Sequence, residues 1–116
     1  MSFDHLKHGK YISLVTFRKD GTAVATPVWF AEREGKLYVK TRADAGKVKR
    51  VRRNAEVRVA PCTFRGSVTG PAVAAKARVL PESEATMARA LLGRKYLFAR
   101  LSLFEGRNVY LEIAPA

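Results

Sequence analysis

The sequence predicts a mainly β domain, a six-stranded antiparallel barrel with one short and one longer helix at its ends. Six segments rich in β-branched and aromatic residues are separated by turn signals, which is typical of strands in an antiparallel sheet. Two segments with helical spacing interrupt these strands. The 116 residues contain no repeat, low-complexity stretch or linker, so we expect a single domain over residues 1–116.

The first forty residues predict a three-stranded meander. Asp20-Gly21 is a strong hairpin signal, and residues 32–35 (EREG) form a second turn. Pro27 cannot donate a ladder hydrogen bond, so its strand should lie at an edge or carry a bulge. The three strands are expected over 11–17 (YISLVTF), 23–30 (AVATPVWF) and 36–41 (KLYVKT).

The next segment, residues 46–54 (GKVKRVRRN), predicts a short helix. Its apolar residues are Val48 and Val51, three apart, which suits a helix that buries one narrow stripe. We expect Asp44 to be the N-cap, and Asn54 to take the left-handed conformation that ends a helix.

A longer helix is expected to open at Pro81, with Glu82 and Glu84 in its first turn, where the helix dipole favours acids. Its predicted buried face consists of Met87, Leu91, Leu92 and Phe98. The remaining strands are predicted over 57–62 (VRVAPC), 72–80 (AVAAKARVL) and 107–113 (RNVYLEI).

Charge is the most unusual property of the composition. Lys and Arg number 22 against 10 Asp and Glu, a net charge of +12, which attracts polyanions of any kind. The single cysteine, Cys62, cannot form an internal disulfide. No segment resembles a signal peptide or is apolar for the roughly 20 residues that span a bilayer, so we expect a cytoplasmic protein without a membrane partner.

Familiar catalytic and metal-binding patterns are missing from the sequence. The only histidines, His5 and His8, lie near the N-terminus, and one cysteine cannot complete a common metal site with them. Neither a Walker nor a Rossmann glycine pattern occurs. An enzyme with this sequence would take its reactive group from a cofactor.

Basic residues concentrate between positions 40 and 58. Thr41 ends a predicted strand and Gly46-Lys47 opens a predicted helix, so this segment offers a phosphate a hydroxyl, free backbone N–H groups and a lysine. Alternatively, the helix simply presents a charged face to solvent. The eight basic residues are Lys40, Arg42, Lys47, Lys49, Arg50, Arg52, Arg53 and Arg58.

The second predicted strand alternates in a way that would suit a planar ligand. Ala25 and Pro27 share one face with Trp29, so a flat ring could approach the backbone with the indole as a wall. The alternative is an ordinary core strand that carries an edge proline.

Several segments, in order and spacing, resemble the pyridoxamine 5'-phosphate oxidase-like superfamily, and more closely its branch of F-420 (deazaflavin)-dependent enzymes. The resemblance implies an FMN-binding split β-barrel and a homodimer with the cofactor in a groove between subunits. One departure is Asn54-Ala55, where many relatives have Asn-Pro. The matching segments are ISLVT (12–16), ATPVWF (25–30), LYVKT (37–41), GKVKR (46–50), VRVAPC (57–62), Gly70-Pro71 and ARVL (77–80).

The resemblance also implies site residues. The end of the third strand and the start of the following helix would bind the cofactor phosphate, and the second strand would support the ring. The residues implied for the phosphate are Thr41, Arg42 and Lys47, with Lys40, Gly46 and Arg50 nearby; those implied for the ring are Ala25, Thr26 and Pro27. Tyr11, Trp29 and Tyr38 are candidates to shape a substrate pocket.

The function implied is hydride transfer between F-420 and a small unsaturated organic acceptor, with FMN as the alternative cofactor. F-420 ranks first because its phosphodiester and oligoglutamate tail need several cations, a role open to Lys49, Arg50, Arg52, Arg53 and Arg58. A non-catalytic carrier of flavin, deazaflavin, haem or bilin is a second hypothesis. Nucleic-acid binding is not expected, because the basic cluster lacks interleaved aromatic residues.

Overall fold

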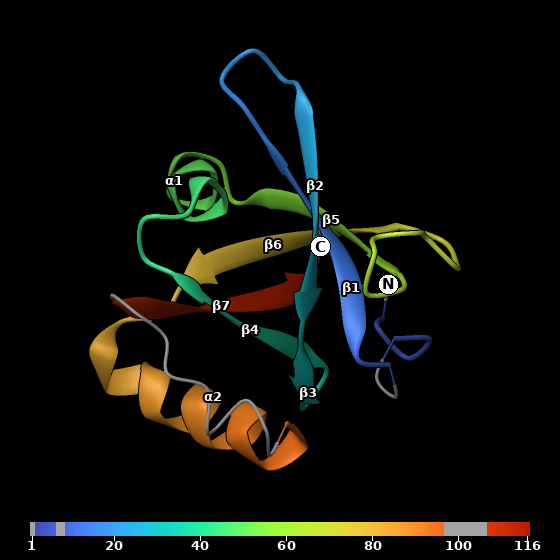
Figure 1. Ribbon diagram of the computed structural model, residues 1–116. Helices are drawn as coiled ribbons and strands as arrows, with labels where there is room; N and C mark the ends of the chain where they lie inside the picture. The colour runs from blue at the N-terminus through green and yellow to red at the C-terminus, as the bar shows by residue number, and fades with distance from the viewer. Residues whose placement is uncertain (1, 7–8, 97–106) are drawn as a thin grey trace.

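A computed structural model describes residues 2–6, 9–96 and 107–116, and shows one curled antiparallel sheet with two helices (Figure 1). The sheet has seven strands in the order β2-β1-β5-β6-β7-β4-β3. The strands are β1 (Tyr11–Phe17), β2 (Ala23–Trp29), β3 (Ala31–Arg33), β4 (Lys36–Arg42), β5 (Glu56–Pro61), β6 (Val73–Val79) and β7 (Asn108–Pro115), and the helices are α1 (Gly46–Arg53) and α2 (Glu82–Lys95).

The curl of the sheet follows from its connectivity. β2 and β3 lie at opposite edges of the sheet, yet only Phe30 separates them in the chain. The two edges must therefore meet, and the fully buried Phe30 ring packs in the core at that junction. This confirms the split-barrel class, with seven strands instead of six.

The additional strand is β3, of which the sequence analysis left Ala31 unassigned and placed Glu32 and Arg33 in the turn after the second strand. The chain bends at Phe30, leaves β1 and pairs with β4, so that one extended segment contributes to both edges. The turn at Glu34 and Gly35 has positive φ at both residues (52° and 79°), which suits a tight two-residue hairpin. Pro27 lies in the edge strand β2, as predicted.

Side chains pack in two clusters on opposite faces of the sheet. The larger cluster fills the inside of the curl with residues from β1, β4, β5, β6, β7 and α1, among them Leu14, Val39 and Val51. The smaller cluster lies between β4, β7 and α2, and includes Tyr38 and Tyr110. In α2 the buried residues are Ala85, Ala88 and Leu92, while Met87 and Leu91 are partly buried and Phe98 lies outside the described residues.

Both predicted caps of α1 are wrong. Ala45 precedes the helix without a side-chain cap, because the Asp44 carboxylate accepts a hydrogen bond from the Arg42 guanidinium instead, with Nε 3.1 Å from Oδ1. Asn54 is extended (φ −141°) and its Oδ1 accepts from the Glu56 N–H at 3.1 Å, which starts β5. Neither described helix has the length and apolarity needed to span a bilayer.

Candidate cofactor site

Helix α1 carries the central part of the candidate site. Val48 and Val51 are its buried residues, and they anchor the helix on the core inside the curled sheet. The remaining side chains of its eight residues, apart from the glycine, are all Lys or Arg. One narrow apolar stripe therefore fixes the helix and leaves its cations available on the other sides.

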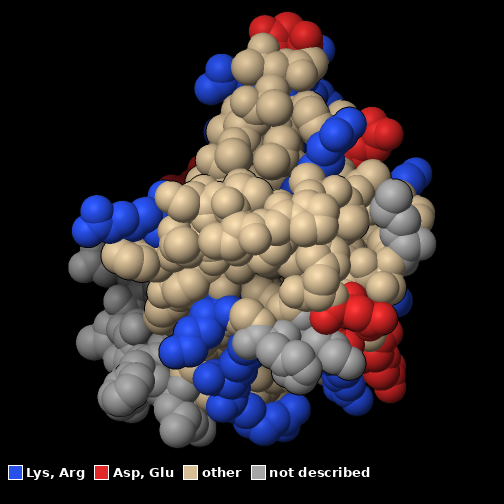
Figure 2. Space-filling view, turned by 90° about the vertical axis from the view of Figure 1, so that its right-hand side faces the viewer, with Lys and Arg blue, Asp and Glu red and all other residues tan. Residues whose placement is uncertain are grey.

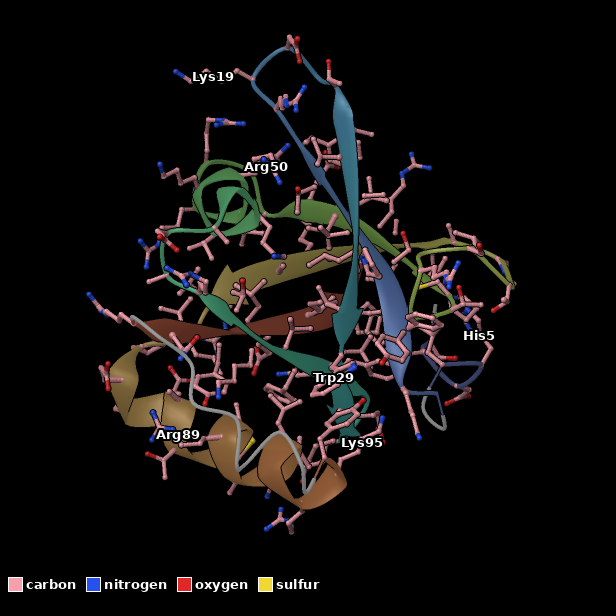
Figure 3. All side chains as sticks on the ribbon, viewed as in Figure 1. His5, Lys19, Trp29, Arg50, Arg89 and Lys95 are labelled. Atoms are coloured by element: carbon pink, nitrogen blue, oxygen red, sulfur yellow. The ribbon has the colours of Figure 1, made fainter. Side chains whose placement is uncertain are left out.

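The side chain of Arg50 extends along the first turn of α1 and is fixed there by a hydrogen bond to β1. Its Nε donates a hydrogen bond to Thr16 Oγ1 of β1 at 2.6 Å, and Thr16 is only 1% exposed. A Cβ at Gly46 would lie 2.7 Å from Arg50 Nη1, so the guanidinium occupies the space that a side chain there would need. Figure 3 shows Arg50 between α1 and the β1–β2 hairpin.

Lys47 lies next to this guanidinium. It is half-buried, and its pKa is lowered by burial and by the neighbouring charge of Arg50. Among the residues that the structure describes, neither Lys47 nor Arg50 forms an ion pair with a carboxylate. Two adjoining cations without an acid repel one another, and a bound anion would relieve that repulsion.

The structure divides the residues predicted at the end of β4 between two faces. Thr41 is buried on the side of Val39, which packs in the same cluster as Val51 of α1. Lys40 points to the opposite side, where burial and Arg89 of α2 lower its pKa. Arg42 is exposed and paired with Asp44. Of the predicted phosphate residues, Gly46 and Arg50 lie against one another, and Lys47 is near enough to Arg50 for the two charges to interact.

β2 pairs with β1, the strand whose Thr16 accepts the hydrogen bond from Arg50. Thr16 is opposite Val24 in the register, and Val15 is opposite Ala25. Thr26 is half-buried on the inner face, where its Oγ1 lies 3.5 Å from the Leu14 carbonyl oxygen, whereas Ala25 and Pro27 face outward. Because β2 is an edge strand, its outer backbone groups are free of strand partners and could meet the polar rim of a ring.

Aromatic side chains gather at the far end of β2. Trp29 stacks on Tyr96, with ring centroids 4.9 Å apart and planes 7° from parallel, and Tyr11 meets Trp29 edge-on at 6.2 Å. The Tyr96 hydroxyl lies 2.5 Å and 2.8 Å from the carbonyl oxygens of Phe30 and Lys10. Burial raises the pKa of Tyr96 to about 12, so the phenol stays protonated and holds the end of α2 against Trp29.

Tyr38 lies apart from this aromatic group. It is buried beneath α2, and its hydroxyl donates to Glu112 Oε2 at 3.0 Å. Burial, followed by the hydrogen bond to Glu112, raises the pKa of Tyr38 to about 12. The structure therefore brings Tyr11 and Trp29 together, while among the described residues no ring contact joins Tyr38 to them.

The cations suggested for an anionic tail also occupy different places. Arg53 Nη2 donates to the Phe17 carbonyl oxygen at 3.0 Å, beside the bond from Arg50 to Thr16. Lys49 and Arg58 are exposed, and Arg52 faces a separate cavity near α2. Arg50 and Arg53 thus fasten α1 to the end of β1.

The sequence analysis missed Thr16 and Tyr96. Thr16 follows Ile12 and Leu14 at alternate, buried positions of β1, and a polar residue in such a register is the signal that could have found it. Tyr96 caps the end of α2, far from β2 in the sequence, and no local pattern predicts its stacking on Trp29.

Comparisons with known proteins agree with this architecture. No match among curated proteins is significant. Among solved structures, a protein of unknown function from Agrobacterium tumefaciens has a TM-score of 0.77 at 16% identity, over 92% of this chain and 48% of that one. The present chain therefore spans about half the length of that relative.

Two further solved structures cover most of both chains. The haem storage protein HutZ from Vibrio cholerae matches with a TM-score of 0.72 at 15% identity, over 98% of this chain and 85% of that one. An F420 reductase matches with a TM-score of 0.65 at 18% identity, over 97% and 92%. At these identities the likeness shows the fold alone. The family model described as pyridoxamine 5'-phosphate oxidase matches residues 4–110, and the chain belongs to that family.

Proposed function

We propose that this protein binds a phosphate-bearing flavin-type cofactor, with F-420 ranked above FMN, and acts as an oxidoreductase. The observation that carries the proposal is the pair of cations at the start of α1, Lys47 and Arg50, which no carboxylate in the described part of the chain neutralises and which β1 separates from β2. A phosphate would neutralise both cations and accept charge-assisted hydrogen bonds from them. When bound, such a cofactor supplies hydride transfer to a small unsaturated acceptor.

The residues present fit the remaining parts of this cofactor class. The outward-facing Ala25 and Pro27 leave room beside β2 for a planar ring, and Trp29 and Tyr11 end that surface with aromatic walls. The protein would bind and orient the ring and exclude water from it, which are the tasks that a cofactor enzyme assigns to its chain. The family and the likeness to an F420 reductase support the same cofactor class.

The proposal includes a homodimer that covers the β2 face. Trp29, Phe64 and Val68 are the large apolar residues exposed among those described, at 39%, 63% and 58%. They come from β2, near the centre of Figure 1, and from the segment after β5, on its right; Figure 2, which views the molecule from the right-hand side, shows a broad uncharged area there. A second copy seated there would enclose a ring lying along β2. Sedimentation equilibrium, with and without cofactor, tests this part.

Cofactor titrations test the central proposal. Purified protein is titrated with F-420 and, in parallel, with FMN, and the fluorescence of the ligand is followed. We expect saturable binding at micromolar concentrations, and a loss of about 10- to 100-fold in affinity in Lys47→Ala, because one charge-assisted contact disappears. Lys76→Ala, which removes an exposed lysine of β6, is the matched control and should bind as the wild type does.

Two results would contradict the proposal. One is the absence of saturable binding for both cofactors. The other is equal weakening by Lys47→Ala and Lys76→Ala, which would reduce the effect to the general field of a +12 protein. Oxidation of reduced F-420 by a panel of enones and quinones separates an enzyme from a carrier.

A carrier of haem is the second candidate, and the likeness to a haem storage protein supports it. His5 is exposed, with Nε2 3.3 Å from the Pro71 carbonyl oxygen, so that nitrogen is available to a ligand only after the contact breaks. A Soret band on adding haem that is lost in His5→Ala would favour this function over the flavin-type one.

A further inference from the structure

A second group of cations surrounds a cavity that the proposed cofactor site does not use. The cavity, about 240 Å³ in volume, opens between the last turn of α1, the start of α2 and the start of β7. Three arginines line it: Arg52 from α1, Arg89 from α2, and Arg107, which directly precedes β7. Arg89 is labelled on α2 in Figure 3.

Among the described residues that line this cavity, positive charges outnumber negative ones. Glu82 is the one acid in the lining, so the ionisable side chains of the wall leave two positive charges in excess. None of the three arginines forms an ion pair with a carboxylate in the described part of the chain. Like charges around one cavity raise the free energy of the folded state, and an anion placed among them reverses that effect.

The three arginines are exposed to solvent, and the lining between them also includes buried apolar side chains and an amide. Leu80 and Tyr110, both buried, form its apolar floor, and Asn108 adds a half-buried amide. Arg89 lies over the Tyr110 ring, with Cζ 5.5 Å from the centroid, which restrains the guanidinium. An arginine beside apolar surface binds an anion more strongly than one surrounded by water, because the local dielectric is lower.

The same arrangement also extends toward β4. Lys40 points to the α2 side of the sheet, and the charge of Arg89 contributes, after burial, to lowering its pKa. Residues at positions 40, 52, 89 and 107 are far apart in the sequence, which is why no motif predicts their meeting.

We propose that this cavity binds a small anion that carries at least two negative charges, such as a phosphoester or a pair of clustered carboxylates, at a place separate from Lys47 and Arg50. Its volume lies below the range of roughly 300–1,000 Å³ that encloses drug-sized ligands, so it fits a compact anion or one end of a longer molecule. The planar, forked donors of arginine match both phosphate and carboxylate oxygens.

Inorganic pyrophosphate is a suitable probe, titrated calorimetrically at low salt. The titration is made in the Lys47→Ala, Arg50→Ala background, so that the first cationic pair does not contribute to the signal. We expect one saturable site per chain, with affinity about tenfold weaker when Arg89→Gln or Arg52→Gln is added, because each removes a charge-assisted contact. Since Arg89 also contacts Tyr110, Arg52→Gln keeps the test informative if Arg89→Gln lowers the Tm.

Arg94→Gln is the matched control, because Arg94 is an exposed residue of α2 outside the cavity and its loss changes the net charge equally. Unchanged affinity in this control, with weakening in the two cavity variants, supports the proposal. Equal weakening in all three variants, or no saturable binding in the background protein, overturns it. None of these outcomes depends on flavin or deazaflavin binding.

A second titration identifies the source of the anion. Displacement of pyrophosphate by F-420 but not by FMN would assign the cavity to the carboxylate tail of the deazaflavin. Undiminished pyrophosphate binding in the presence of either cofactor would assign it to a free anion. Both results are compatible with the cavity as an anion site, and they differ only in where the anion comes from.

Discussion

Two polar groups of this protein use arginine in opposite ways. Around Glu112 on β7, Arg78 donates Nε to Oε1 at 2.9 Å and also pairs with Glu84, while Tyr38 donates to the other carboxylate oxygen. At the start of α1, Arg50 has a neutral hydroxyl as its partner and Lys47 as its neighbour. The first group is complete without a ligand, whereas the second holds two cations that no described carboxylate balances.

The comparison separates stability from binding. A buried carboxylate surrounded by donors stabilises the folded chain and has little left to offer a ligand. The neighbouring charges of Arg50 and Lys47 destabilise the folded state, and an anion bound between them would reduce that destabilisation. Substitutions in the Glu112 group should therefore change unfolding alone, and substitutions around Arg50 should change binding as well.

The largest effect on unfolding is expected from Glu112→Gln. The change removes the negative charge with which Arg78 and Lys36 both form ion pairs. It also weakens the acceptor of the hydrogen bond from the buried Tyr38 hydroxyl. We expect a loss of about 2 kcal/mol in the free energy of unfolding, toward the low end for charged hydrogen bonds because Arg78 is half exposed to water. Urea denaturation measures it.

The control for this substitution is Glu56→Gln, an exposed acid at the start of β5 that no described ion pair includes. It should unfold within about 0.5 kcal/mol of the wild type. Cofactor and pyrophosphate affinity should not change in either variant. A loss of affinity in Glu112→Gln at unchanged stability would show that the Glu112 group does take part in binding.

Acidification should reproduce part of this loss. Burial raises the pKa of Glu112, but the hydrogen bonds from Arg78 and Tyr38 outweigh it, and the net pKa is below the ordinary value of 4.5. The ionised carboxylate is therefore favoured by folding, so its stabilisation is present above pH 4.5 and is lost as the pH falls toward the folded-state pKa. The difference in unfolding free energy between wild type and Glu112→Gln should shrink over that interval; a constant difference would contradict the assignment.

The sequence predicted the ladder of strands and the short cationic helix because both depend on local patterns. β-Branched and aromatic residues define β1, alternation defines β2, and the spacing of Val48 and Val51 defines α1. The caps failed because Asp44 found a stronger partner in Arg42, an ion pair that a propensity for capping does not consider. Likewise, β3 was not predicted, because a segment of three residues is too short for its sequence pattern to show that the chain stops pairing with β1 and begins to pair with β4.

The candidate site was predictable in composition and not in geometry. Lys47 and Arg50 lie in one conspicuous basic segment, but their fixation depends on Thr16, 34 residues away in the sequence from Arg50. The cavity between α1, α2 and β7 depends on three arginines that only the tertiary fold brings together. Pairings between distant segments are decided by packing, and a single sequence does not report them.

Thr16→Val tests whether the hydroxyl holds Arg50 for binding. Valine fills the same volume in the core but offers no acceptor, so Arg50 should turn toward solvent. We expect a loss of about 1 kcal/mol in unfolding free energy and about fivefold in cofactor affinity, the cost of ordering a free guanidinium on binding. Thr16→Ser retains the oxygen and should restore most of the affinity. Equal affinity in the valine and serine variants would reduce Thr16 to a core residue.

Gly46→Ala should have the smallest effect on unfolding and gives the sharpest separation of the two properties. The added Cβ would lie 2.7 Å from Arg50 Nη1, the mobile end of a long side chain, so the guanidinium moves while the helix remains. Alanine also favours helix over glycine, which offsets the cost of that movement, and the free energy of unfolding should change by less than about 0.5 kcal/mol. Cofactor affinity should nevertheless fall about threefold, because Arg50 no longer lies where the anion would meet it.

In an Arg50→Ala background the same substitution should change nothing, since the side chain it displaces is gone, and this double-mutant cycle assigns the effect to one contact. An equal loss of affinity with and without Arg50 would instead mean that the anion approaches the backbone of Gly46 itself, with the arginine a bystander.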